Sequence, residues 1–282
     1  MNAPTVEIGT DADQKELDDS GKAVFDGIYD APDPRLYYHA MASLDYRIPE
    51  LAKPYFVDMF DRYRRARDRT ALNIIDLGAS YGVNAALLKW DLSLEQLFGR
   101  YTDPDSRSVE TMELLNKDRA FFQQKAGQPG LHITGFDISE RALHYALQAG
   151  IIDDAVSANL EEREPAAAEA AILSQADGMI SSGCIGYVSE TTLLRIIDTC
   201  GSNRPWMTHC VLRMFPLEPL EQALQSRGYR IGHEAHLVPQ RRFVSSDEQA
   251  SVIARLHELG IDPGGFESEG WLYATVVTAT PE

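Results

Sequence analysis

From Leu72 onward, short apolar segments alternate with amphipathic stretches of helical length. Residues 72–76 and 131–137 have the composition of buried strands, and each is followed by a predicted helix, at about 81–88 and 141–148. Strands that alternate with helices of this length predict βαβ units around a parallel sheet. Further strands are expected at 155–160, 176–181, 206–215, 229–237 and 271–280. The sequence therefore predicts an α/β protein.

One α/β domain accounts for residues 71–282, with a polar, helical insertion at about 91–130. Residues 21–70 are richer in aromatic side chains, and Asp33-Pro34 has the form of an N-cap followed by proline at the first helical position. We therefore expect a helical N-terminal cap over residues 21–70. Residues 1–20 carry six acidic side chains against one lysine, which predicts an acidic disordered tail.

The overall charge limits the partners. The chain has 43 acidic and 26 basic residues, a net charge of -17, which argues against binding to the phosphate backbone of a nucleic acid. No apolar segment reaches the ~18 residues that span a bilayer. Three cysteines without a CxxC pair favour a reducing cytoplasm over a disulfide framework, and no cluster has the spacing of a metal site. We expect a cytoplasmic protein without metal, membrane or nucleic acid, and this interpretation allows a homodimer.

The segment most informative about chemistry follows the first predicted strand. Asp76 ends that strand, and Gly78 and Gly82 shape a tight turn into a helix, where the backbone approaches a ligand closely and the helix N-terminus adds partial positive charge. The glycine spacing does not fit the G-x-G-x-x-G dinucleotide fingerprint. The Asp76 carboxylate would repel a pyrophosphate and suits a ligand with an ammonium group. The structural alternative is that Asp76 only caps the turn.

The stretch Asp76-Leu-Gly-Ala-Ser-Tyr-Gly82 resembles motif I of the class I S-adenosylmethionine-dependent methyltransferases, roughly (D/E)-x-G-x-G-x-G. Ser80 stands where the middle glycine of that motif is found. The resemblance covers about residues 70–280. It implies a Rossmann-like sheet with helices on both faces, and S-adenosylmethionine as the cofactor.

The resemblance also implies binding roles for residues at the ends of later strands. Asp137, with Ile138 beside it, would contact the ribose hydroxyls of the cofactor. Asn159 and Leu160 would lie at the adenine. Ser181 would lie at the reactive end. Together with Asp76 and the Gly78–Gly82 turn, these are the expected cofactor-binding residues.

The spacing of the two acidic residues is unusual. Asp76 and Asp137 are 61 residues apart, whereas a nucleotide-binding βαβ unit places its ribose acid about 20 residues further on. The predicted insertion at 91–130 accounts for the excess. The alternative is that Asp137 is only a helix-entry residue.

Two further regions supply candidate catalytic residues. Ser182 and Tyr187 lie in a glycine-containing loop after the fourth strand, which lines the reactive end of the cofactor in the family that the chain resembles. The N-terminal region contributes tyrosines that either fill the core or form a lid whose ring faces hold a sulfonium cation and exclude water. These tyrosines are Tyr29, Tyr37, Tyr38 and Tyr46, of which Tyr38 and Tyr46 are the preferred candidates.

Three functions are compatible with these features. The first is methyl transfer from S-adenosylmethionine to a small-molecule acceptor of the secondary-metabolite type. The second is cyclisation of the cofactor alone with release of methylthioadenosine, as in the azetidine-2-carboxylate synthases, which suits the altered motif I and the lack of an obvious base. The third is a non-catalytic S-adenosylmethionine-binding regulator, against which the intact Asp76, Gly78, Gly82 and Asp137 argue.

Overall fold

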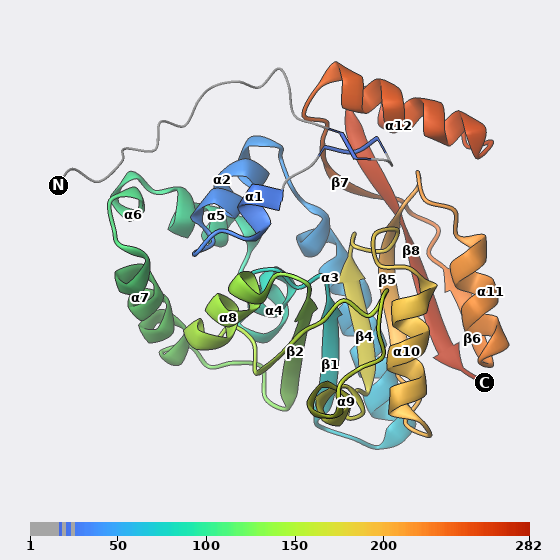
Figure 1. Ribbon diagram of the computed structural model, residues 1–282, viewed down its shortest axis with the longest axis horizontal. Coiled ribbons are helices and arrows are strands. Elements are labelled where there is room, and N and C mark those ends of the chain that lie inside the picture. Colours follow the sequence, from blue (N-terminus) through green and yellow to red (C-terminus); the bar gives the residue numbers. More distant parts are fainter. Residues whose placement is uncertain (1–16, 19–20, 24–25) are drawn as a thin grey trace.

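The computed structural model describes residues 17–18, 21–23 and 26–282. Its centre is an eight-stranded sheet with the order β3-β2-β1-β4-β5-β8-β6, and β7 also pairs with β8 (Figure 1). The strands are β1 (Leu72–Leu77), β2 (Leu131–Asp137), β3 (Asp154–Ser157), β4 (Gly178–Ser182), β5 (Trp206–Leu212), β6 (Tyr229–His233), β7 (Val238–Arg242) and β8 (Trp271–Pro281). β1 to β5 are parallel to one another, whereas β8 runs antiparallel to β5, β6 and β7.

Among the described residues, three helices precede the first strand, and the others connect or follow the strands. The helices are α1 (Asp26–Tyr29), α2 (Arg35–Ser43), α3 (Ile48–Arg67), α4 (Val83–Lys89), α5 (Leu94–Thr102), α6 (Pro104–Arg107), α7 (Thr111–Gln123), α8 (Glu140–Ala149), α9 (Ala167–Leu173), α10 (Glu190–Cys200), α11 (Glu218–Ser226) and α12 (Ser246–Glu258), with a short 3-10 helix at Glu267–Glu269. α5, α6 and α7 lie where the sequence predicts a helical insertion.

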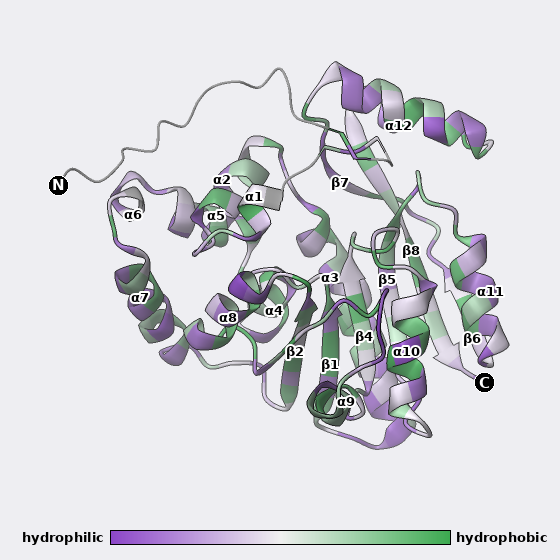
Figure 2. Ribbon diagram, viewed as in Figure 1, coloured by the Kyte–Doolittle hydropathy of each residue, from purple (hydrophilic) through white to green (hydrophobic). Residues whose placement is uncertain are grey.

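The sheet is covered on both faces, which explains why its central strands carry apolar side chains on both sides. Successive side chains of a strand point to opposite faces, so Ile74 packs into one cluster of buried residues and Ile75 into another. Side chains of α3, α4 and α8 belong to the first cluster, and those of α9, α10 and α11 to the second. In Figure 2 the hydrophobic colour follows the central strands between these layers.

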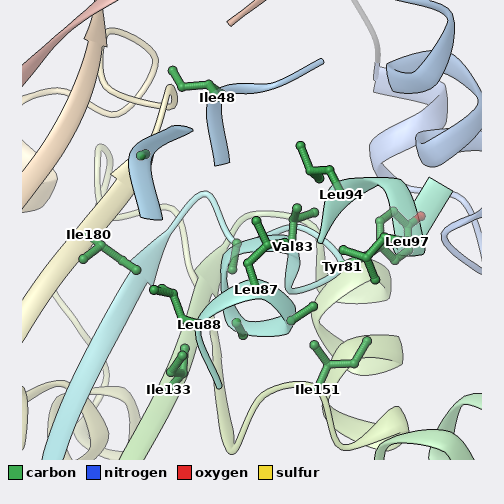
Figure 3. Packing of buried hydrophobic residues seen from close by; sticks show 14 of the residues in the cluster. Ile48, Tyr81, Val83, Leu87, Leu88, Leu94, Leu97, Ile133, Ile151 and Ile180 are labelled. Carbon is green, nitrogen blue, oxygen red and sulfur yellow. The ribbon is translucent and has the colours of Figure 1, made fainter. Parts of the chain in front are cut away.

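Helix α4, which follows the glycine turn, is held by this packing. Val83, Leu87 and Leu88 of α4 lie among the buried residues of the first cluster, with Ile133 of β2 and Ile180 of β4 (Figure 3). All five side chains are at most 7% exposed. The start of α4, and with it the turn after β1, is therefore fixed against the sheet.

The predicted α/β fold class is confirmed, and the main difference concerns the C-terminal strands. The predicted strand 229–237 ends at His233, and a separate strand, β7, follows it. β7 contains Pro239 and pairs only with β8, as expected for a proline-containing strand at the margin of a sheet. Its polar, proline-containing sequence hides it from a search for apolar runs.

The N-terminal predictions fall partly outside the described residues. Of the predicted tail, only Leu17 and Asp18 are described, and Leu17 forms an isolated antiparallel bridge with Ala23. Within the predicted cap, α3 packs against β4, β5 and β7, so this helix belongs to a layer of the sheet. α2 instead packs against α5 of the insertion.

Candidate functional site

A cavity of about 1040 Å³ lies at the carboxyl ends of the parallel strands. Its wall is built from the segments that follow β1, β2, β3 and β4, from α1 and α2, from the described residues 18, 22 and 23, and from β7. The sheet order reverses direction between β1 and β4, and open α/β sheets bind ligands in the crevice at such a point. This cavity is thus where this fold class places its ligands.

The turn after β1 has a backbone that depends on glycine. Gly78 has a φ of 69°, and a Cβ built on it would lie 2.6 Å from the Cβ of Cys184, so both conformation and space exclude a side chain. Ser80 adopts a φ of 48° although it carries a side chain. Gly82, with a φ of 77°, is the N-cap of α4 and does not line the cavity, in contrast to Gly78 and Ser80.

Asp137 joins this turn to the end of β2. One carboxylate oxygen accepts a hydrogen bond from the backbone N–H of Ser80 (2.8 Å), and the other accepts one from the N–H of Ser139 (3.0 Å). Burial raises the pKa of Asp137, and these backbone donors oppose that rise. Asp137 lines the cavity, and the neighbouring Ile138 lies at its rim with 75% of its surface exposed.

Asp76 lies fully buried beneath the cavity wall. Its Oδ1 accepts a hydrogen bond from the Asn84 amide (2.8 Å), which also donates to the hydroxyl of Ser182 (3.1 Å). Among the described residues, neither Asp76 Oδ2 nor Asn84 Oδ1 has a hydrogen-bond partner. Burial raises the pKa of Asp76 to about 7. Asn84 lines the cavity, so this pair presents unsatisfied oxygen atoms at the ligand side of β1.

Sequence analysis missed Asn84. The available signal is that it is the only polar residue in the first turn of an otherwise apolar helix, Val83-Asn-Ala-Ala-Leu-Leu88. The Asn84 side chain is buried together with its apolar neighbours in the sequence. A buried polar side chain at the start of a helix indicates a specific partner.

The structure brings three of the four N-terminal tyrosines to the cavity. Tyr29, Tyr37 and Tyr46 line it, with the Tyr37 and Tyr46 rings edge to face at 6.4 Å. The hydroxyl of Tyr46 interacts with those of Tyr37 and Ser182, and burial raises the pKa of Tyr46, which keeps it neutral. Tyr38 does not line the cavity. Its ring stacks on that of Tyr101 at 4.5 Å in the core, so the structure places this candidate away from the site.

The candidates on the loop after β4 divide in the same way. Ser182 and Tyr187 line the cavity, and Tyr187 packs edge to face against Phe215 at 5.4 Å. Ser181 does not line it, because its hydroxyl is buried in a hydrogen bond with His209 Nδ1 (2.9 Å). Ser181 and Ser182 therefore point to opposite faces of the sheet, as the alternation of side chains along β4 requires, and only Ser182 reaches the cavity.

The segment after β3 contributes the remaining predicted residues. Asn159 and Leu160 both line the cavity, Leu160 buried and Asn159 exposed. The side-chain oxygen of Asn159 accepts a hydrogen bond from the N–H of Glu161 (3.1 Å), which closes a local turn.

Three cavity residues come from segments that carry no recognisable motif. Lys22 lies next to the predicted tail, and Gln240 and Arg241 lie on β7. They are separated from the other site residues along the sequence. The pairing of β7 with β8, the hydrogen bond from the Arg47 N–H to the Gln240 carbonyl, and the bond from the Ala23 N–H to Glu248 place them here. The sequence around each of them contains no pattern that predicts a place in the cavity.

In the described part of the chain, no group of three or more His, Cys, Asp or Glu side chains is arranged to hold a metal ion. The same part contains no helix that is both long enough and apolar enough to cross a membrane.

No protein-family model and no curated protein matches the chain. Among solved structures, the plantazolicin methyltransferase BpumL in complex with SAH is similar, at 14% identity, a TM-score of 0.42, and coverage of 91% of this chain and 93% of that one. A SAM-dependent methyltransferase from Geobacter sulfurreducens in complex with S-adenosyl-L-homocysteine is similar at 11% identity and a TM-score of 0.35, covering 79% and 90%. A functionally unknown protein from Deinococcus radiodurans R1 is similar at 14% identity and a TM-score of 0.42, covering 85% and 90%.

The strand order is the feature that defines the fold. Five parallel strands in the order β3-β2-β1-β4-β5 are followed by the antiparallel β8, which lies between β5 and β6. With the glycine turn after β1 and an acidic residue at the end of β2, this is a Rossmann-like α/β sheet with helices on both faces, as the sequence predicts.

Proposed function

We propose that the protein is an S-adenosylmethionine-dependent transferase that methylates a small-molecule acceptor. The observation that carries this proposal is the set of polar atoms at the end of β1 and in the turn and helix that follow it. Asp76 Oδ2, Ser80 Oγ and Asn84 Oδ1 are buried without partners among the described residues, next to a large cavity. Such atoms are costly to bury unless a ligand satisfies them.

The residues present fit this cofactor. Asn84 Oδ1, with the Asp76 carboxylate behind it, would accept hydrogen bonds from the ammonium group of the methionine moiety. Asp137 would hold the ribose hydroxyls through the lone pairs that its two backbone donors leave free. Leu160 supplies an apolar surface for the adenine.

When bound, the cofactor supplies a methyl group on a positively charged sulfur. The chain then has to orient an acceptor and exclude water. Tyr29, Tyr37 and Tyr46 provide electron-rich ring faces in the cavity wall, which suit a sulfonium cation. The hydroxyl of Tyr46 interacts with that of Ser182, so both groups belong to the same part of the wall.

The size of the cavity supports a second molecule beside the cofactor. At about 1040 Å³ it lies at the upper end of the ~300–1,000 Å³ range of small-molecule pockets. The wall also includes Phe215 and residues of β7, which lie outside the segments that follow β1 to β3. The three free thiols, Cys184, Cys200 and Cys210, support our proposal of a cytoplasmic location.

Asp76 favours a second candidate reaction, cyclisation of the cofactor with release of methylthioadenosine. In that reaction the amine of the methionine moiety must lose a proton before its nitrogen attacks the γ-carbon and the bond to sulfur breaks. A carboxyl group with a pKa of about 7 and an unpartnered oxygen is suited to take that proton near neutral pH.

Product analysis tests both reactions. The protein is incubated with S-adenosylmethionine alone and with S-adenosylmethionine plus a small-metabolite extract, and the products are identified by mass spectrometry. Adenosylhomocysteine that appears only with the extract supports methyl transfer. Methylthioadenosine formed without the extract, above the level in a protein-free control, supports cyclisation. Failure of the protein to bind either adenosyl product in calorimetry would overturn the cofactor assignment.

A further inference from the structure

Lys22 lies on the cavity wall, and none of the contacts proposed above involves it. Its backbone N–H donates a hydrogen bond to the Asp18 carboxylate (3.1 Å). The next residue, Ala23, donates its N–H to Glu248 of α12 (2.8 Å). These bonds fix the backbone on each side of Lys22, so its side chain enters the cavity from a defined position.

The charge of Lys22 has no close counter-ion. Its ammonium lies 5.0 Å from the centre of the Tyr187 ring and makes no ion pair with any described residue. The charged groups that face it are Arg241 of β7, Glu248 of α12 and Asp18, together with the thiol of Cys184. Burial and the nearby Arg241 lower the pKa of Lys22 to about 7, although Glu248 and Asp18 act in the opposite direction.

Glu248 is the acidic group that acts most strongly on the charge of Lys22, but it is already engaged. Its two oxygens accept hydrogen bonds from Arg241 at 2.9 and 2.6 Å. They also accept the N–H groups of Ala23 and Val244, each at 2.8 Å. The Glu248 carboxylate is therefore paired with Arg241, and an anion in the cavity would be a better partner for Lys22.

Gln240 supplies an independent sign of a ligand. Its side chain is 4% exposed and lines the cavity, yet its Oε1 has no hydrogen-bond partner among the described residues. Gly183 packs closely on the amide, because a Cβ built on Gly183 would lie 2.4 Å from Gln240 Nε2. Gly183 thus holds the Gln240 amide in place. The buried Oε1 still lacks a hydrogen bond within the described part of the chain, and an N–H or O–H group of a ligand can donate one.

We propose that Lys22 and Gln240 form a subsite that binds a carboxylate-bearing ligand, with Lys22 on the carboxylate and Gln240 on an N–H or O–H group of the same molecule. This inference rests on the proposed function, since it concerns the ligands of that cavity. The carboxylate comes from the acceptor or from the methionine moiety of the cofactor. The contacts of Lys22 favour the acceptor, because Tyr187 and Phe215 follow β4 and β5, whereas the unsatisfied oxygens suited to the cofactor follow β1.

Calorimetry on the wild-type protein and the variants Lys22→Met and Lys22→Arg separates these sources. Three ligands are used: adenosylhomocysteine, which has a carboxylate, methylthioadenosine, which has none, and propionate added to protein saturated with adenosylhomocysteine. We expect both adenosyl compounds to bind Lys22→Met within twofold of wild type. Propionate should bind wild type and Lys22→Arg, and at least tenfold more weakly to Lys22→Met. Melting temperatures establish that each variant is folded.

A tenfold loss of adenosylhomocysteine affinity in Lys22→Met, with methylthioadenosine unchanged, would also support the subsite and would assign it to the carboxylate of the cofactor. Unchanged adenosylhomocysteine affinity together with no Lys22-dependent binding of propionate would overturn it. If wild type bound neither adenosyl compound, the proposed function would fail, and propionate added to the protein alone would still decide the role of Lys22.

Lactate tests the part of Gln240, because it adds an O–H group to the propionate skeleton. We expect wild type to bind lactate more tightly than propionate and Gln240→Leu to bind both equally. An unchanged preference for lactate in Gln240→Leu would remove Gln240 from the subsite.

Discussion

The carboxylate of Asp137 and the backbone N–H of Ser80 are joined by a hydrogen bond of 2.8 Å. The bond connects the end of β2 to the turn after β1 in the wall of the cavity. Ser80 holds a φ of 48°, which is unfavourable for a residue with a side chain, so the bond also helps to maintain the conformation of the turn. Asp137 therefore has a structural role in the free protein as well as the ligand role proposed for it.

Replacement of Asp137 by alanine should affect both roles. We expect a lower melting temperature, because the N–H groups of Ser80 and Ser139 lose their acceptor. Adenosylhomocysteine should bind about tenfold more weakly or worse, since a hydrogen bond to a charged group contributes roughly 1.5–3 kcal/mol. Calorimetry at a temperature where the variant remains folded measures the second effect. Unchanged affinity would remove Asp137 from the cofactor site.

The pKa of Asp76 makes a prediction about stability. In the unfolded chain Asp76 ionises near pH 4, whereas burial raises its pKa to about 7 in the folded protein. The folded state therefore loses stability as the pH rises from about 4 to 7, and the full cost remains above pH 7. Asp76→Asn keeps an oxygen for Asn84 and removes this cost, so its melting temperature should exceed that of wild type at pH 8 but not at pH 4.

The same substitution should weaken adenosylhomocysteine binding, because the ammonium group of the ligand loses a carboxylate. Thermal denaturation at the two pH values and calorimetry at pH 8 provide the measurements. An equal shift of melting temperature at both pH values would show that ionisation of Asp76 is not the cause.

Tyr46 and Tyr38 form a matched pair for the sulfonium hypothesis. Tyr46 lines the cavity and Tyr38 stacks on Tyr101 in the core. We expect Tyr46→Leu to weaken S-adenosylmethionine binding by up to about 30-fold, the equivalent of about 2 kcal/mol, while adenosylhomocysteine, which has no positive charge on sulfur, loses far less. Tyr46→Phe should retain the difference between the two ligands, because the ring face remains.

Tyr38→Leu is the control for that experiment. It should lower the melting temperature, since it removes a buried, stacked ring, and should leave the affinity ratio of the two ligands at the wild-type value. The sulfonium hypothesis fails if Tyr46→Leu and Tyr38→Leu change the ratio to the same extent.

Gly78 allows a test of the turn itself. Gly78→Ala should destabilise the protein by about 1–3 kcal/mol through left-handed backbone strain, with an added cost from the clash with the Cβ of Cys184. In Gly78→Ala/Cys184→Gly the clash is absent and only the strain remains, so the double variant should lose less than the sum of the two single losses. Chemical denaturation measures each free energy of unfolding. Strict additivity would show that the two side chains do not meet.

The sequence predicts an element correctly where its local pattern favours the same structure that the tertiary contacts stabilise. The buried strand from Leu131 to Asp137 and the helix capped by Ser139 and ended by Gly150 are found as predicted, because apolar runs and cap residues act locally. β7 was missed, since Pro239 and the arginines beside it are stable as a strand only through pairing with β8.

The same distinction applies to the candidate site. Gly78 lies in the contiguous stretch Asp76–Gly82, Asp137 ends a recognisable buried strand, and the structure places both on the cavity. Ser181 and Ser182 are adjacent in sequence, but the alternation of β4 directs only Ser182 to the cavity, and the exact end of a strand is difficult to predict. Lys22 and Gln240 reach the site through tertiary contacts that leave no signature in the sequence around them.

The position of β8 has a consequence for how the chain acquires its structure during synthesis. β5, β6 and β7 are all made before β8, yet each of them pairs with it. Until residues 271–281 are available, β5 has an open hydrogen-bonding edge, and exposed edges of this kind promote association between chains. The parallel half of the sheet can assemble as it emerges from the ribosome, whereas Gln240 and Arg241 reach the cavity only after the last strand has been inserted. A nascent chain interrupted before Trp271 is therefore a target for chaperones or proteases rather than a smaller version of the same protein.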